Sequence, residues 1–421
     1  MSVSLRCYST SLGCPKNRVD TERLLGSLGV ALVPVESPDE AELVFINTCA
    51  FIQPATEESV RTIAQAIADI EELPKRPLLA VAGCLVGRYH AEDLAPELPE
   101  VDLWLDNSDL EAWPAMLARK LGLPEPTVPG LSTGPSYAWL KISDGCRHAC
   151  SFCAIPNIRG GHRSHCKDMI VREARALLDQ GVKELNLVAQ DLTEWGCDLD
   201  GKQDLRTLLD GLLPLQGLER LRLMYLYPAG MTHEMLKYLR EAGKPFVPYF
   251  DVPVQHSHPD VLSRMGRPFA RNPREAIDRI RNVFPEAALR TSIMVGFPGE
   301  TEEHFEHLRE FIEEVRFQHL GVFAYRAEEG TPAAAMPDQV EDRVKEWRRD
   351  LLMEAQADIS AEWLSRFEGD RLPILVDAPH PEWPGLHTGR AWFQAPEIDG
   401  MVYISGPGVE PGALVDADIV E

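Results

Sequence analysis

The strongest constraint on this chain is a run of three cysteines within eight residues, Cys146-Arg147-His148-Ala149-Cys150-Ser151-Phe152-Cys153. The run follows a predicted strand at 137–143, so we expect a loop at the carboxyl end of that strand. Thiolates are soft ligands that suit iron, and a short loop allows three of them to bind one iron–sulfur cluster. A four-iron cluster normally takes four thiolates, so three would leave one iron open to an outside ligand.

Zinc is the alternative metal for this loop, and buried structural thiols are the alternative without a metal. A structural zinc ion takes a fourth nearby Cys or His, which His148 or His162 could provide. The spacing of the cysteines favours iron but leaves both alternatives open.

The length and composition indicate a globular protein of two or three domains. The chain has no run of about 18 apolar residues and no basic segment followed by an apolar one at its N-terminus. We therefore expect a cytoplasmic protein that does not enter a membrane. Nine cysteines without an export signal are expected to be reduced ligands rather than disulfides. The net charge of −24 argues against binding nucleic acid mainly through its phosphates.

Residues 1–130 are predicted to form an α/β domain with a doubly wound parallel sheet. Apolar strands alternate with helices along this part of the chain, which is typical of parallel sheets covered on both faces. The predicted strands are 3–9, 31–35, 43–47, 78–82 and 101–105, and the predicted helices are 17–28, 55–72 and 109–121. The Pro-rich segment 123–135 then predicts a linker to the next domain.

Three further cysteines, Cys14, Cys49 and Cys84, each follow one of these predicted strands. Because ligands collect at the carboxyl edge of an open parallel sheet, we expect the three thiols to converge there. Convergent thiolates indicate a second cluster with an open iron. The alternative is three unrelated buried cysteines, since free cysteine is among the most buried residue types. The remaining cysteines, predicted to be structural, are Cys7, Cys166 and Cys197.

Residues 135–335 continue the alternation for about six units, which predicts a partial (β/α)6 barrel. Its later strands are predicted at 184–188, 221–226, 246–254, 289–295 and 320–325. Reactive groups of such barrels lie on loops at the carboxyl ends of the strands. The corresponding stretches here are Ala189-Gln190-Asp191, Tyr227-Pro228, Gln255-His256-Ser257 and Gly296-Phe297-Pro298-Gly299-Glu300. Glycine allows a ligand to approach the backbone; the alternative for the last stretch is a tight turn before a helix.

The C-terminal part is predicted to be a connecting helix, within 336–367, followed by a small antiparallel β-barrel at 368–421. The barrel strands are predicted at 372–376, 389–393, 401–404 and 413–420. Residues 368–421 hold ten acidic and two basic residues, a net charge of −8. An RNA-binding surface should carry Lys and Arg, whereas this segment would repel phosphate and attract a very basic protein. The alternative is a scaffold domain that touches no substrate.

Together, the cysteine run, the three dispersed cysteines and the β-rich tail resemble the methylthiotransferases, a branch of the radical S-adenosylmethionine (SAM) enzymes. The stretches that carry the resemblance are Ser11–Asn17, Asn47–Cys49, Ala82–Leu85, Lys141–Cys146, Val295–Thr301 and Glu329–Pro332. The tail resembles the TRAM domain, which binds RNA in tRNA-modifying relatives. Three more stretches resemble the branch that modifies the β-carbon of an aspartate in protein S-twelve of the small ribosomal subunit: Cys153–Gly160, Leu187–Asp191 and Met224–Pro228.

The resemblance implies two [4Fe–4S] clusters, and SAM as both methyl donor and radical source. The implied ligands are Cys146, Cys150 and Cys153 for the cluster that binds SAM, and Cys14, Cys49 and Cys84 for the cluster that carries the inserted sulfur. Phe152, Gln190 and the Gly296 turn would help to hold SAM. The implied partners are the basic ribosomal protein, either free or on the ribosome, and a low-potential electron donor such as flavodoxin or ferredoxin.

Three alternative functions remain open at this point. The chain could be a tRNA adenosine methylthiotransferase with the same two-cluster chemistry. It could instead be a radical SAM enzyme whose N-terminal cluster only relays electrons, or a metal-bound module that docks on ribosomes without catalysis. Sulfur insertion further requires that the carboxyl edge of the first sheet cap the mouth of the barrel, because a carbon radical needs its sulfur donor within reach.

Overall fold

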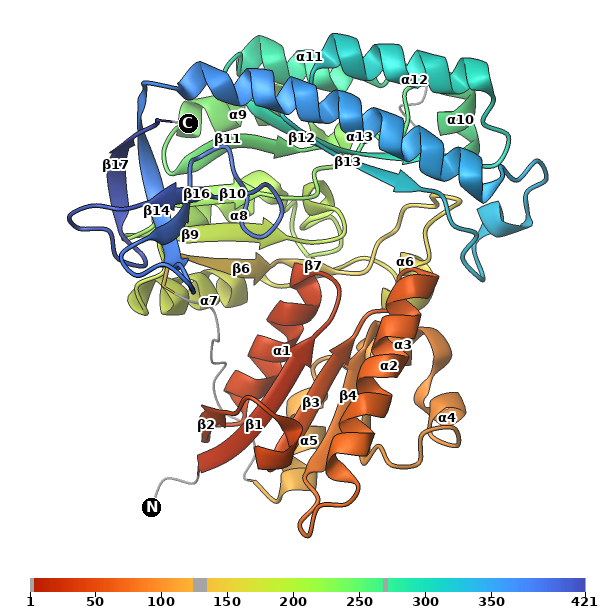
Figure 1. The fold of residues 1–421 in the computed structure, drawn as a ribbon, viewed down its shortest axis with the longest axis vertical. Helices are drawn as coiled ribbons and strands as arrows, with labels where there is room; N and C mark the ends of the chain where they lie inside the picture. The colour runs from red at the N-terminus through yellow and green to blue at the C-terminus, as the bar shows by residue number, and fades with distance from the viewer. Residues whose placement is uncertain (1–3, 124–134, 268–271, 421) are drawn as a thin grey trace. The chain divides into compact units, whose positions relative to one another are not determined.

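The computed structural model describes residues 4–123, 135–267 and 272–420, and contacts within the chain divide it into two compact units (Figure 1). The first unit comprises Met1–Ser132, Asp144–Arg147 and Cys153–His162, and the second comprises Thr133–Ser143, His148–Phe152 and Arg163–Glu421. The chain therefore changes units within the three-cysteine loop, so that Cys146 and Cys153 belong to the first unit and Cys150 to the second. The predicted linker lies almost entirely outside the described residues.

The first unit is built on a five-stranded parallel sheet, which confirms the predicted doubly wound domain. Its strands are β1 (Ser4–Ser11), β2 (Ala31–Pro34), β3 (Leu43–Thr48), β4 (Leu78–Gly83) and β5 (Leu103–Asp106), in the order β2-β1-β3-β4-β5. Helices α1 (Pro15–Ser27) and α5 (Trp113–Leu121) share a core with one face, and α2 (Gln53–Ile70) shares a core with the other.

Side chains of β3 show why the sheet is covered on both faces. All six of its residues are buried. Leu43 and Phe45 belong to the core with α1 and α5, whereas Val44 and Ile46 belong to the core with α2. Successive residues of a strand point to opposite faces, so an unbroken apolar run needs helices on both sides. Two short helices were not predicted, α3 (Cys84–Tyr89) and α4 (Ala91–Leu94).

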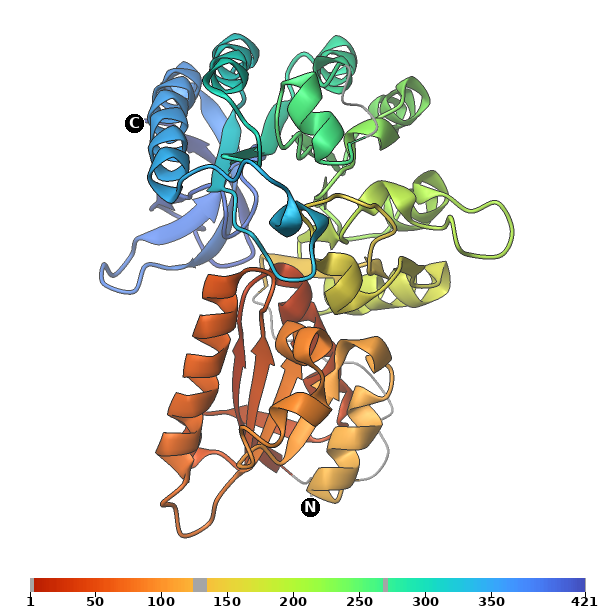
Figure 2. The same ribbon diagram turned by 90° about the vertical axis from the view of Figure 1, so that its right-hand side faces the viewer.

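The second unit contains a six-stranded parallel sheet in the order β13-β12-β11-β10-β9-β6, which confirms the partial barrel. Its strands are β6 (Tyr137–Lys141), β9 (Glu184–Val188), β10 (Arg220–Leu223), β11 (Phe246–Asp251), β12 (Ala288–Val295) and β13 (His319–Ala324). The helices that follow them form an arc outside the curved sheet (Figure 2): α7 (Lys167–Asp179), α8 (Leu205–Leu212), α9 (His233–Ala242), α11 (Arg274–Val283) and α12 (Glu302–Val315). The short helix α10 (Pro259–Arg264) was not predicted.

A long helix and an antiparallel sheet complete the second unit. Helix α13 (Asp342–Leu364) leads to the strands β14 (Arg371–Pro379), β15 (His387–Arg390), β16 (Val402–Ile404) and β17 (Leu414–Asp418). They form an antiparallel sheet in the order β16-β15-β14-β17, as expected for the small β-rich tail. Across the described ranges, no helix has both the length and the apolar character needed to cross a membrane.

The C-terminal sheet is anchored at the amino ends of the barrel strands. Arg390 of β15 donates from Nη1 to Oε2 of Glu184, the first residue of β9, at 2.9 Å. Arg220, the first residue of β10, donates to the main-chain oxygen of Arg390 at 3.0 Å. His319, the first residue of β13, bonds the main-chain oxygen of Phe393 at 2.7 Å. These contacts attach the tail at the amino ends of the strands. Reactive groups are expected at the opposite, carboxyl ends.

Glu184 is predicted to be the main electrostatic anchor of this interface. Burial raises the pKa of Glu184, but the positive charges of Arg390, Arg222 and Arg220 outweigh burial and lower it to about 2, from the usual 4.5. Because the folded-state pKa is the lower one, the carboxylate stabilises the fold fully above pH 4.5, and this contribution is lost as the pH falls toward 2. Glu184→Gln leaves buried arginines without their partner, so we expect a loss of about 3–5 kcal/mol at neutral pH.

Urea unfolding of the metal-free chain at several pH values measures this effect. The Glu184→Gln chain should also show a weaker dependence of stability on pH across the acidic range in which Glu184 titrates. Glu313→Gln, which breaks an ion pair on the solvent-exposed face of α12, is the matched control. A loss for Glu184→Gln no larger than that of the control would contradict the assignment.

Candidate functional site

The three dispersed cysteines of the first unit meet at the carboxyl edge of its sheet. Cys14 is the N-cap residue of α1 just after β1, Cys49 directly follows β3, and Cys84 directly follows β4 as the first residue of α3. The three strands are neighbours in the sheet. A Cβ atom added to Gly13, whose φ is +86°, would lie 2.6 Å from Sγ of Cys49, so the chain segment before Cys14 touches the second thiol.

The electrostatics of the triad show that its thiols share one environment. Burial, together with the charges of Cys84 and Cys14, raises the pKa of Cys49 to about 12. Burial also raises the pKa of Cys84, against the opposing charge of Arg159. The pKa of Cys14 is lowered, because Lys16, Arg159 and the main-chain N–H groups at the start of α1 outweigh its burial.

Three sulfur donors in one buried place fit a metal centre. Bare thiolates would repel one another in these surroundings, whereas a bound cation compensates their charges and favours their deprotonated form. All three are reduced thiols without a disulfide. The donor set is therefore the one that an iron–sulfur cluster requires.

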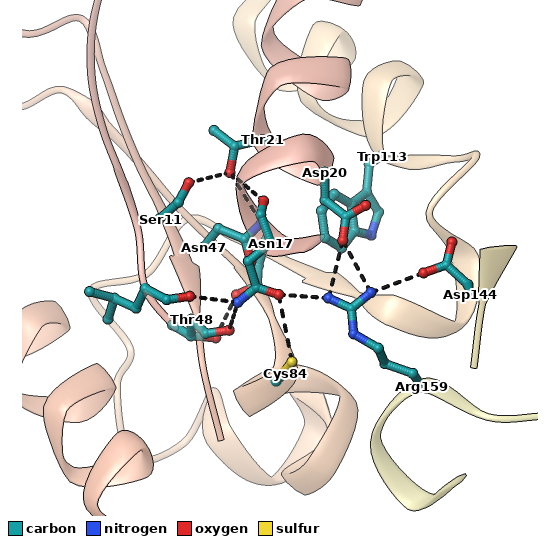
Figure 3. A network of polar contacts seen from close by, with 12 residues as sticks. Ser11, Asn17, Asp20, Thr21, Asn47, Thr48, Cys84, Trp113, Asp144 and Arg159 are labelled. Carbon is teal, nitrogen blue, oxygen red and sulfur yellow. Dashed lines mark hydrogen bonds and ion pairs between the residues drawn. The ribbon is translucent and has the colours of Figure 1, made fainter. Parts of the chain in front are cut away.

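Arg159, the last residue of α6 (Ile155–Arg159), lies in the polar network around Cys84 (Figure 3), and the sequence alone does not identify it. Its guanidinium donates from Nη2 to Oδ1 of Asn17 at 2.6 Å and from Nη1 to Oδ1 of Asp144 at 3.0 Å. Both terminal nitrogens lie 3.2 Å from Oδ2 of Asp20. One buried cation thus joins helix α1, which begins after Cys14, to the segment that precedes Cys146.

Asparagine and serine side chains hold the loops of the triad in place. Asn17 donates from Nδ2 to the main-chain oxygens of Leu12 and Thr48, each at 2.8 Å, and its Oδ1 lies 3.7 Å from Sγ of Cys84. Ser59 of α2 accepts from the main-chain N–H of Cys49 at 3.0 Å and donates to its carbonyl at 2.7 Å. These buried polar groups satisfy the irregular backbone around the cysteines.

The three-cysteine loop is held mainly by main-chain contacts. In the first unit, the N–H of Cys146 donates to the carbonyl of Gly160 at 3.2 Å. In the second unit, Ser151 donates from its main-chain N–H to the carbonyl of Met265 at 3.1 Å and from Oγ to the carbonyl of Arg264 at 2.8 Å. Cys146, Cys150 and Cys153 are all half-buried residues.

The three residues expected to hold SAM have different surroundings. Phe152 packs against the apolar cluster that contains Phe297, beside the Gly296 turn. Gln190 follows β9, and neither atom of its buried amide has a hydrogen-bond partner among the described residues. Such a group fits a polar ligand. Gly296 has φ +71°, and a Cβ there would lie 2.2 Å from Cγ of Lys345, so both the backbone conformation and this neighbour favour glycine.

His148, which could have completed a zinc site, has another partner. Its Nε2 lies 2.6 Å from Oδ2 of Asp191, and its ring stacks on Tyr227 with the centroids 4.0 Å apart. Arg267 lies over the rings of Tyr227 and Phe152, at 5.2 Å and 5.7 Å. The sequence identifies Asp191 and Tyr227 only as polar residues at the ends of predicted strands. Of the cysteines predicted to be structural, Cys7 is buried but Cys166 and Cys197 are exposed, so a core role fits Cys7 alone.

Comparison with known proteins defines the class of each part. Residues 6–106 match the uncharacterized protein family UPF0004, residues 140–312 match the radical SAM superfamily, and residues 369–421 match the TRAM domain. The radical SAM methyltransferase TsrM from Kitasatospora setae shares the fold, with a TM-score of 0.59 at 14% identity over 92% of this chain and 81% of that one. The central domain is thus a radical SAM barrel.

Relatives over the whole length identify the family. A protein of Nitratidesulfovibrio vulgaris (strain DP4) named ribosomal protein uS12 methylthiotransferase RimO is 70% identical over 98% of this chain and 97% of its own. A protein of the same name from Lawsonia intracellularis is 62% identical over 100% of this chain and 96% of its own. The chain belongs to the uS12 methylthiotransferase (RimO) family.

Gly13→Ala is expected to remove iron from the N-terminal triad, because the added methyl group would displace the Cys49 thiol. Gly122→Ala is the matched control: Gly122 also has positive φ, +68°, but a Cβ there meets nothing within 4 Å. Both changes impose the same kind of backbone strain. After anaerobic reconstitution, iron analysis should show loss from Gly13→Ala only, and equal iron contents in the two variants would refute the prediction.

Proposed function

We propose that this chain inserts a methylthio group at the β-carbon of an aspartate in ribosomal protein uS12. The observation that carries the proposal is the 70% identity, over 98% of the chain, to a protein named for this activity. Two sets of three cysteines, one at a sheet edge and one on the loop after the first barrel strand, support it from this chain's own residues.

Each set of cysteines has a separate role in this proposal. Cys146, Cys150 and Cys153 hold the [4Fe–4S] cluster that binds SAM, and Cys14, Cys49 and Cys84 hold a second [4Fe–4S] cluster. When bound, the clusters and SAM supply the electron, the hydrogen-abstracting radical and the methylthio group that the reaction needs. Three thiolates at each site leave one iron for a ligand from outside the protein.

SAM is held by groups at the carboxyl edge of the barrel. The ring of Phe152, fixed by the apolar cluster behind it, offers a flat face to the adenine. The amide of Gln190, which has no hydrogen-bond partner in the described part of the chain, supplies both a donor and an acceptor. The Gly296 turn, whose N–H already donates to Glu300 at 2.9 Å, shapes the wall of the site.

The acidic C-terminal domain attracts the basic body of uS12 in this proposal and does not bind the target aspartate. Its sheet is anchored at the amino ends of the barrel strands. Trp383 and Tyr403, which are 63% and 60% exposed, offer aromatic faces suited to Arg side chains. Charge complementarity acts over a distance and raises the association rate.

The reductant in this proposal is a low-potential electron donor such as flavodoxin or ferredoxin, and the reaction takes place in the cytoplasm.

Mass spectrometry of uS12 and tRNA from cells that lack the gene tests the function. The target aspartate of uS12 should lose its methylthio group while methylthioadenosine in tRNA persists. A methylthio-aspartate that remains in the deletion strain would end the assignment. Loss of methylthioadenosine with uS12 unchanged would favour the tRNA-modifying alternative.

Gln190→Leu is expected to weaken SAM binding about tenfold, because the ligand loses a hydrogen bond in a buried place. Equilibrium binding of SAM to the reconstituted chain measures this effect. Gln180→Leu, at the exposed end of α7, is the control and should bind SAM as the unmodified chain does. Equal affinities for the two variants would remove Gln190 from the site.

Charge reversal in the C-terminal domain should slow the modification of uS12 at low ionic strength. The double variant Glu382→Lys with Asp416→Lys changes two exposed acidic residues. Salt screens such attraction, so the difference in kcat/KM should shrink as ionic strength rises. The control, Glu71→Lys with Glu72→Lys after α2, makes the same charge change in the first unit. Equal effects of both double variants would exclude a specific role for the tail.

A further inference from the structure

We propose that Arg159 is a positioning residue that sets the electrostatic environment of the N-terminal cluster and couples it to the segment that precedes Cys146. This inference rests on the proposed role of Cys14, Cys49 and Cys84 as ligands of that cluster. It concerns a residue that does not itself bind iron.

The burial of Arg159 shows that its charge is compensated within the protein. Its side chain is 2% exposed, as is that of Asp20, and that of Asp144 is 4% exposed. Burying an ion costs free energy unless the ion is paired and hydrogen-bonded. Removal of one partner would leave the remaining buried charges uncompensated. Arg159, Asp20 and Asp144 therefore form one charge group with a net charge of −1 when all are ionised (Figure 3).

This charge group is placed to act on the thiolates. The positive charge of Arg159 acts on both Cys84 and Cys14. Asn17 lies between Arg159 and Cys84. Its Oδ1 accepts a hydrogen bond from Arg159 at 2.6 Å and lies 3.7 Å from Sγ of Cys84. Electrostatic effects are strong in such buried surroundings. A cluster held by three thiolates gains negative charge on reduction, so Arg159 favours the reduced form, whereas the carboxylates of Asp20 and Asp144 oppose it.

Two members of this charge group, Asp144 and Arg159, flank the three-cysteine loop in the sequence. Asp144 stands two residues before Cys146, and Arg159 stands six residues after Cys153. Their ion pair, at 3.0 Å, closes the base of the loop that carries the SAM cluster ligands. A substitution of Asp144 therefore probes whether this segment is electrostatically connected to the N-terminal site.

The effects of substitutions differ according to whether Arg159 only stabilises the fold or also sets the potential of the cluster. Substitutions that only loosen the fold should lower stability or iron content without a consistent effect on potential. An electrostatic role predicts opposite shifts from opposite charge changes. Removal of the cation should lower the midpoint potential of the cluster, and removal of either carboxylate should raise it.

The test is a redox titration, followed by electron paramagnetic resonance, of the full reconstituted chain in which Cys146, Cys150 and Cys153 are replaced by Ala. Only the N-terminal cluster then contributes a signal. We expect a lower midpoint potential for Arg159→Gln, a higher one for Asp20→Asn and Asp144→Asn, and little change for Arg159→Lys, which keeps the charge. Arg76→Gln is the control. Arg76 precedes β4, at the opposite edge of the sheet, and pairs with Asp102, so its removal should change the midpoint potential little.

The outcomes separate this inference from the proposed function. Iron bound as expected, with Arg159→Gln and Asp20→Asn shifting the potential in the same direction or not at all, overturns the role of Arg159 alone. A chain that binds no iron without Cys146, Cys150 and Cys153 overturns the ligand assignment and the inference with it. If Arg159→Gln does not fold, Asp20→Asn and Asp144→Asn decide: an unchanged or lowered potential in both overturns the proposal.

Discussion

The candidate site of the first unit depends on bringing three thiols together in largely buried surroundings without leaving their charges uncompensated. Parallel strands bring Cys14, Cys49 and Cys84 to one edge, because their carboxyl ends all point the same way. The start of α1 and the guanidinium of Arg159 then supply positive charge. A bound cation would complete this balance, so the same geometry that makes bare thiolates unfavourable makes the site suitable for a cluster.

The second unit separates attachment from chemistry along the barrel strands. The C-terminal sheet is fixed at their amino ends through Glu184 and Arg390. The opposite ends carry Gln190, the Gly296 turn and the His148–Asp191 pair, none of which the tail needs for its attachment. A radical SAM barrel can therefore gain a charged accessory domain without rebuilding the end of the barrel that holds SAM.

Most of the architecture could be predicted from the sequence, because buried parallel strands are continuous apolar runs and β3 and β9 are fully buried. The convergence of Cys14, Cys49 and Cys84 followed from their places after strands. Arg159 could not be predicted, since its partners Asn17 and Asp20 lie 142 and 139 positions away and no local pattern marks them. Helix α3 could not be predicted, because it is short and its N-cap residue, Gly83, is a residue type that is common in loops.

The most direct test of the account is to locate iron in the reconstituted chain by anomalous X-ray scattering. The account predicts two separate iron sites, one bound by Cys14, Cys49 and Cys84 and the other by Cys146, Cys150 and Cys153. Iron at the second set alone, with the N-terminal thiols unliganded or joined in a disulfide, would contradict it.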